Sequence, residues 1–87
     1  MQFSVLLSIY HKENHLFFHR AMTSIWDEQS LKPDEIVLVE DGPLTDSLYE
    51  AISYWQKKIP TILKTIKLDE NQGLGKALAI GLEACSF

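Results

Sequence analysis

The sequence predicts an α/β fold: a three-layer, Rossmann-like β-α-β-α-β-α unit built on a parallel sheet. Short apolar runs without helical spacing alternate three times with segments whose apolar residues recur every three or four positions. Such alternation gives parallel strands joined by right-handed crossovers, with helices on both faces of the sheet. The chain has 87 residues, 46% apolar and 23% charged, which suits one domain and excludes a disordered composition.

Residues 3–9 form the first apolar run, and we expect a strand buried on both faces, as in parallel sheets. Asn14 follows as a helix cap, since its side chain can accept from the free amides of a first turn. Apolar residues at helical spacing predict a helix to about Gln29, before Pro33; they are Phe18, Met22 and Ile25. The Gln29 amide is expected to satisfy free carbonyls at the helix end.

Residues 36–39 predict a second buried strand, which ends in Glu40, Asp41, Gly42 and Pro43 and must turn sharply there. A second helix follows, capped by Thr45 or Asp46. One apolar stripe marks its buried side: Leu44, Leu48, Ile52, Trp55 and Ile59.

Residues 61–68 predict a third strand, and Lys64 and Lys67 within it suggest a sheet edge. After a loop, a third helix is expected to be lined by Leu74, Leu78 and Leu82, with Ala77 and Ala84 close by. The expected strand order is 3-2-1, which leaves the apolar first strand as an open edge, unpaired or paired with a neighbouring molecule. Because natural folds cover such edges, we expect residues 1–87 to be the first part of a longer protein.

Composition excludes several classes of protein. Eight Lys and Arg against twelve Asp and Glu give a net charge of −4, so no basic surface is left for nucleic acid. The single cysteine, Cys85, allows no internal disulfide and suits a reducing, cytoplasmic location. The apolar runs are far shorter than the ~20 residues of a membrane span, and no basic region suggests a signal peptide.

Open α/β sheets bind ligands beyond the carboxyl ends of their strands. Residues 8–10, 40–42 and 71–76 meet there and offer a hydroxyl, an aromatic ring, two acids, loop amides and a lysine. This set suits a nucleotide, with the ring against a base and the amides at a diphosphate. The alternative interpretation is that residues 40–42 form only a solvated turn.

Other motifs carry less weight. Gly73 and Gly75 do not follow the first strand and lack a third glycine, so a dinucleotide fingerprint and a P-loop are both excluded. His11, His15 and His19 recur every four residues, but a solvent-facing helix side explains them better than a metal site.

Four segments together resemble the opening part of the family 2 glycosyltransferases, which have the GT-A fold. They are residues 8–13, 24–30, 33–43 and 71–82. Lys12-Glu13 and residues 40–43 look like the forms found in bacterial enzymes of surface polysaccharide assembly. By this resemblance, residues 1–87 are the incomplete, N-terminal nucleotide-sugar-binding part of a glycosyltransferase domain.

The resemblance implies roles for individual residues. Ser8 and Tyr10 would flank the nucleobase, and Glu40 would bind uracil or its ribose, with Asp41 following it. Lys76 would lie near the diphosphate. The implied reaction moves a sugar from a nucleotide-diphosphate donor, a UDP-sugar, to a glycan or lipid-linked acceptor, in the cytoplasm or at the inner face of the membrane.

Two departures limit the implied activity. Ala79 stands where the family has Asn, so any polar contact made there is lost. The family's Asp-x-Asp motif for a divalent metal, Mn or Mg, and its catalytic base would lie outside this chain, so the 87 residues alone should be inactive. Two alternatives remain: a nucleotidyltransferase-like enzyme, and a non-catalytic, receiver-like interaction module.

Overall fold

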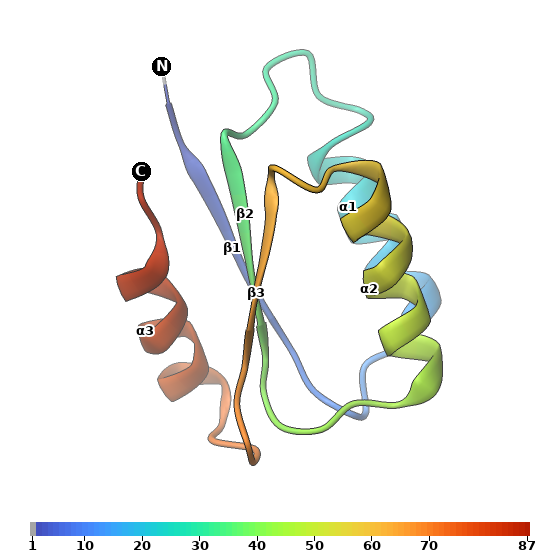
Figure 1. Cartoon of the computed structure of the whole chain (residues 1–87), viewed down its shortest axis with the longest axis vertical. Coiled ribbons are helices and arrows are strands. Elements are labelled where there is room, and N and C mark those ends of the chain that lie inside the picture. Colours follow the sequence, from blue (N-terminus) through green and yellow to red (C-terminus); the bar gives the residue numbers. More distant parts are fainter. Residues whose placement is uncertain (1) are drawn as a thin grey trace.

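The computed structural model describes residues 2–87 and confirms the three-layer α/β architecture (Figure 1). Helices α1 and α2 cover one face of the sheet, and α3 covers the other. The elements in chain order are β1 (Ser4–Ile9), α1 (His15–Ile25), β2 (Glu35–Glu40), α2 (Asp46–Lys58), β3 (Leu63–Lys67) and α3 (Leu74–Ala84).

The three strands are parallel in the order β1-β2-β3, which confirms the predicted order with β1 and β3 at the edges. Every residue of β2 is buried, because it has a strand on each side and helices on each face. In β1 only Ile9 is fully buried, and the other five residues are half-buried. The expectation that the first strand is buried on both faces is met in part. Val5 and Leu7 pack against the core on one face, and Leu6 lies against α3 on the other. The strand stays half-buried because, among residues 2–87, no strand covers its outer edge.

Helix α1 begins where the sequence predicts and ends earlier. The Asn14 side chain accepts from the backbone N–H groups of Leu16 and Phe17, at 2.8 and 3.3 Å. The helix ends at Ile25 instead of near Gln29, whose side-chain amide donates to the Ser24 carbonyl at 3.1 Å. The Gln29 side chain thus satisfies a free carbonyl near the end of the helix, as expected.

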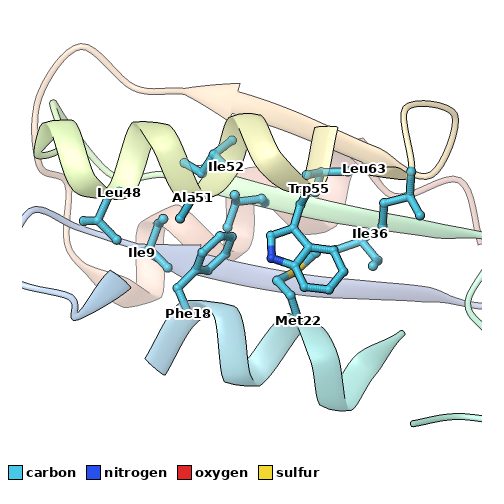
Figure 2. Close-up of a cluster of buried hydrophobic side chains, with 11 residues drawn as sticks. Ile9, Phe18, Met22, Ile36, Leu48, Ala51, Ile52, Trp55 and Leu63 are labelled. Carbon is cyan, nitrogen blue, oxygen red and sulfur yellow. The ribbon is translucent and has the colours of Figure 1, made fainter. Parts of the chain in front are cut away.

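Figure 2 shows the main core, which lies between the sheet and helices α1 and α2. Trp55 is only 1% exposed, and its indole Nε1–H donates to His19 Nδ1 at 3.0 Å, which links α2 to α1. The other buried members include Phe18, Met22, Ile36, Leu38, Leu48 and Ile52. No helix within residues 2–87 is long and apolar enough to cross a membrane.

Helix α3 packs on the opposite face through its smallest residues. Ala77 and Gly81 are buried there, whereas Leu74 and Leu82 are 64% and 67% exposed. The prediction that leucines line this contact is therefore wrong for Leu74 and Leu82, whereas Leu78 is half-buried. A Cβ at Gly81 would lie 2.4 Å from a methyl carbon of Leu6, so only small residues allow α3 to approach the sheet this closely.

A buried carboxylate joins the elements at the amino ends of the strands. Glu35 accepts from the Ser4 hydroxyl and the Lys64 ammonium, both at 2.6 Å, and from the Ser86 backbone N–H. The bonds from Lys64 and then Ser4 lower the pKa of Glu35 to about 2. Because Glu35 contacts all three strands and the end of the chain, it stabilises the sheet at the end opposite to the candidate site.

Candidate functional site

A cavity of about 380 Å³ opens at the carboxyl ends of β1 and β2. Its lining comes from the ends of both strands, the turn after β1 and the loop that leads into α3: Ser8, Tyr10, Glu13, Asp41, Asn71, Gly73 and Leu74. This is the position at which open α/β sheets bind ligands, and it is where the sequence placed the candidate site.

Asp41 holds the two sides of the cavity together. One carboxylate oxygen accepts from the Gln72 backbone N–H at 2.6 Å, and the other accepts from the Gly73 N–H at 3.1 Å. Gly42, at φ +90°, lets the two loops touch, since a Cβ there would lie 2.8 Å from the Asn71 nitrogen. A carboxylate has about four acceptor positions, so Asp41 keeps capacity for a ligand donor after binding both amides.

The pleat of β2 separates the two acids at its end. Val39 contacts the α3 side, whereas Leu38 packs in the core with α1 and α2. Since successive side chains of a strand point to opposite faces, Asp41 lies on the α3 face and Glu40 on the α1–α2 face. The structure thus brings Ser8, Tyr10 and Asp41 together around the cavity and leaves Glu40 outside its lining.

Glu40 is 2% exposed and lies beside Lys67 in the register of the sheet. Burial raises the pKa of Glu40, and the positive charge of Lys67 opposes that rise. This placement gives Glu40 a different environment from Asp41, and the role of Glu40 in nucleotide binding stays a prediction.

Lys76 lies in the first turn of α3, is exposed, and is not part of the cavity lining. Gly73, at φ +92°, precedes the helix and supplies no side-chain cap. The first amides of α3 have no carbonyl partner inside the helix, and together with the helix dipole they favour an anion. Gly73 and Leu74 line the cavity, so this end of α3 adjoins it.

Sequence reasoning missed Glu13 as a cavity residue. Its backbone N–H donates to the Tyr10 carbonyl at 3.0 Å, and this tight turn brings Glu13 back towards the strand end. Asn71 was missed as an individual residue, although its segment was expected at the site; its side-chain oxygen accepts from the Gly73 N–H at 3.1 Å. In the sequence, the only feature that could have placed Glu13 at the cavity was its short separation from Tyr10 along the chain.

The cavity residues do not form a metal site. Across residues 2–87, no group of three or more His, Cys, Asp or Glu side chains is placed to hold a metal ion. A divalent ion therefore does not fit the residues present.

A family model and three curated proteins match the sequence of this chain. The family model described as "Glycosyl transferase family 2" matches residues 4–86. This chain belongs to glycosyl transferase family 2. The match spans all six helices and strands, including every segment that lines the cavity.

Three curated relatives place this family 2 chain among bacterial glycosyltransferases. It is 43% identical over 84 residues to the amylovoran biosynthesis glycosyltransferase AmsE of Erwinia amylovora, covering 97% of the chain and 30% of that protein. It is 45% identical over 87 residues to an uncharacterised glycosyltransferase of Haemophilus influenzae, covering 100% of the chain and 32% of that protein.

The third relative is the UDP-Gal:alpha-D-GlcNAc-diphosphoundecaprenol beta-1,3-galactosyltransferase of Escherichia coli. Identity is 38% over 84 residues, with 97% of the chain and 30% of that protein covered. The chain thus spans about a third of the length of the curated relatives it matches.

Proposed function

We propose that this chain forms the nucleotide-binding part of the donor site of a glycosyltransferase in bacterial polysaccharide synthesis. The donor would be a nucleotide-diphosphate sugar, and UDP is the nucleotide that we favour because the Escherichia coli relative is named for UDP-Gal. The observation that carries the proposal is the cavity at the carboxyl ends of β1 and β2 in a chain of this family.

Each chemical part of the donor has a counterpart in the cavity. The Tyr10 ring is 41% exposed and offers a flat apolar surface for a base. The remaining acceptor positions of Asp41 suit a base N–H or a ribose hydroxyl, and the Ser8 hydroxyl can donate or accept beside them. The open amides at the start of α3 suit the diphosphate.

This assignment gives Asp41, and not Glu40, the acceptor role at the base. The reason is the strand pleat, which places Asp41 on the cavity side and Glu40 on the opposite face. We assign Lys76 a more distant, electrostatic role, because it lies in the first turn of α3 but outside the cavity lining.

The acceptor that we propose is a glycan or a lipid-linked sugar, as in the diphosphoundecaprenol of the Escherichia coli relative's name. A lipid-linked acceptor would place the reaction in the cytoplasm at the inner face of the membrane, with the protein in peripheral contact with the lipid. Residues 2–87 contain a cavity suited to the donor nucleotide and no metal-ligand cluster, so we expect no sugar transfer by this chain alone.

The proposal is tested by titrating the ¹⁵N-labelled chain with UDP and following its backbone amides by NMR. We expect shifts concentrated at Ser8, Tyr10 and residues 71–74, and no comparable shifts with ATP or acetyl phosphate. Ser8→Ala should weaken the UDP response, whereas Ser53→Ala, an exposed change on α2, should leave it unchanged. Equal responses to UDP and ATP, or no response around the cavity, would reject the proposal.

A further inference from the structure

The cavity at the carboxyl ends of β1 and β2 contains a second carboxylate besides that of Asp41. It belongs to Glu13, which is half-buried in the turn after β1. The Glu13 backbone N–H donates to the Tyr10 carbonyl at 3.0 Å, so Glu13 lies beside the aromatic residue of the site. The base and diphosphate contacts proposed above leave this carboxylate without a role.

The Glu13 carboxylate keeps its acceptor capacity for a ligand. The backbone amides of Gln72 and Gly73 donate to Asp41 at 2.6 and 3.1 Å, and Gly73 also donates to Asn71 Oδ1 at 3.1 Å. A carboxylate has about four acceptor positions, and these loop amides occupy none of those of Glu13. Both ion pairs within residues 2–87 lie outside the cavity lining, so neither neutralises its charge.

The charge of Glu13 decides which part of a nucleotide-diphosphate sugar can lie beside it. Two negative charges a few ångströms apart repel each other more strongly in a partly buried site than in water, so the diphosphate is excluded from this side of the cavity. The open amides at the start of α3 and the nearby Lys76 attract the diphosphate to the other side. Glu13 therefore faces the uncharged nucleoside.

The ribose is the part of the nucleoside that matches a free carboxylate. Uracil has one N–H donor, and Asp41 is assigned to the base together with the Tyr10 ring. The ribose connects that base to the diphosphate, so it lies between Tyr10 and the start of α3. Its 2′ and 3′ hydroxyls are adjacent donors, and the two oxygens of one carboxylate can accept from both. Acidic side chains bind ribose hydroxyls at other α/β nucleotide sites.

We infer that Glu13 binds the ribose diol of the donor and makes the site selective for ribonucleotides over 2′-deoxyribonucleotides. This inference rests on the proposed donor site and adds a specificity-determining residue to it. A 2′-deoxyribose lacks one of the two donors, so one oxygen of the half-buried carboxylate is left without a partner.

Isothermal titration calorimetry of the 87-residue chain with UDP and with 2′-deoxyuridine diphosphate tests the inference. Because both ligands carry the same diphosphate, the ratio of their affinities cancels the repulsion between Glu13 and phosphate. We expect the wild type to bind UDP about tenfold more tightly, the effect of one hydrogen bond to a charged group. Glu13→Ala should bind the two ligands within about twofold of each other, and Glu13→Gln should lie between, since its amide keeps one uncharged acceptor oxygen.

Glu83→Ala is the matched control, because Glu83 is exposed in the last turn of α3, at the end opposite to the cavity, and the change removes the same charge. It should keep the full preference for UDP, and backbone amide spectra check that every variant is folded. A wild type that does not bind UDP would reject the proposed function and this inference together. UDP binding at the cavity without a preference over the deoxynucleotide, or a preference that Glu13→Ala retains, would overturn the ribose role alone.

Discussion

Asp41→Asn tests whether one carboxylate holds the walls of the cavity together. The wild-type carboxylate is 3% exposed and accepts from the Gln72 and Gly73 backbone N–H groups at 2.6 and 3.1 Å. An Asn side chain keeps one acceptor oxygen and turns an NH₂ group towards the other amide. The variant therefore loses at least one charge-assisted hydrogen bond, about 1.5–3 kcal/mol.

A loss of that size is a large part of the ~5–15 kcal/mol that stabilises a small domain. For a chain of this length, each kcal/mol corresponds to roughly 4–8 °C in Tm, so we expect a fall of about 6–24 °C. Differential scanning calorimetry measures it directly. Asp69→Asn is the control, since Asp69 is exposed and lies just after β3. An Asp41→Asn Tm equal to that of the wild type would refute this role.

Four more predictions follow from the structure. The pKa of Glu35 is lowered to about 2, chiefly by Lys64. The stability that ionised Glu35 contributes to the fold is therefore complete above its ordinary pKa of 4.5 and is lost as the pH falls towards 2. Glu35→Gln should therefore flatten the acid side of a Tm-against-pH curve, and an unchanged curve would contradict this. Gly81→Ala should cost about 1–3 kcal/mol in urea unfolding because its Cβ has no room, whereas Gly75→Ala, with nothing within 4 Å, should gain about 0.5–1 kcal/mol. Glu40→Ala should keep UDP affinity within about twofold in calorimetry, because its carboxylate lies outside the cavity lining; a loss of tenfold or more would return the base-binding role to Glu40. The chain alone should convert no UDP-sugar above background, and turnover detected by chromatography would contradict the assignment of a donor half-site.

The order and type of the elements could be predicted from the sequence. The spacing of apolar residues that distinguishes a strand from a helix lies within each short segment of the chain. Asn14 and Thr45 cap α1 and α2 as expected, and the three strands follow the predicted order. The role of the Gln29 amide at the end of α1 was predicted, whereas the exact residue at which the helix ends was not. The prediction that Leu74 and Leu82 line the buried side of α3 was also wrong, since the close approach of α3 to the sheet places the small residues Ala77 and Gly81 there.

The segments that surround the cavity could be predicted from the sequence, and the binding roles of their individual side chains stay predictions. The strand ends meet at one edge for any parallel sheet, which brought Ser8, Tyr10 and Asp41 together. Choosing between Glu40 and Asp41 required the exact strand register, because a shift of one residue exchanges the two faces. Glu35 was not recognised as structural, since its partners Ser4 and Lys64 lie 31 and 29 residues away in the sequence.

The nucleotide site is tested most directly by measuring whether the base of UDP contacts Tyr10. Nuclear Overhauser effects should be measured between the uracil protons of UDP and the protein side chains, at a UDP concentration that saturates the chain. We expect effects from uracil to the Tyr10 ring and to the Leu74 methyl groups, since both residues line the cavity. Effects only to residues of α1 or α2, or saturation without any effect to Tyr10, would contradict it.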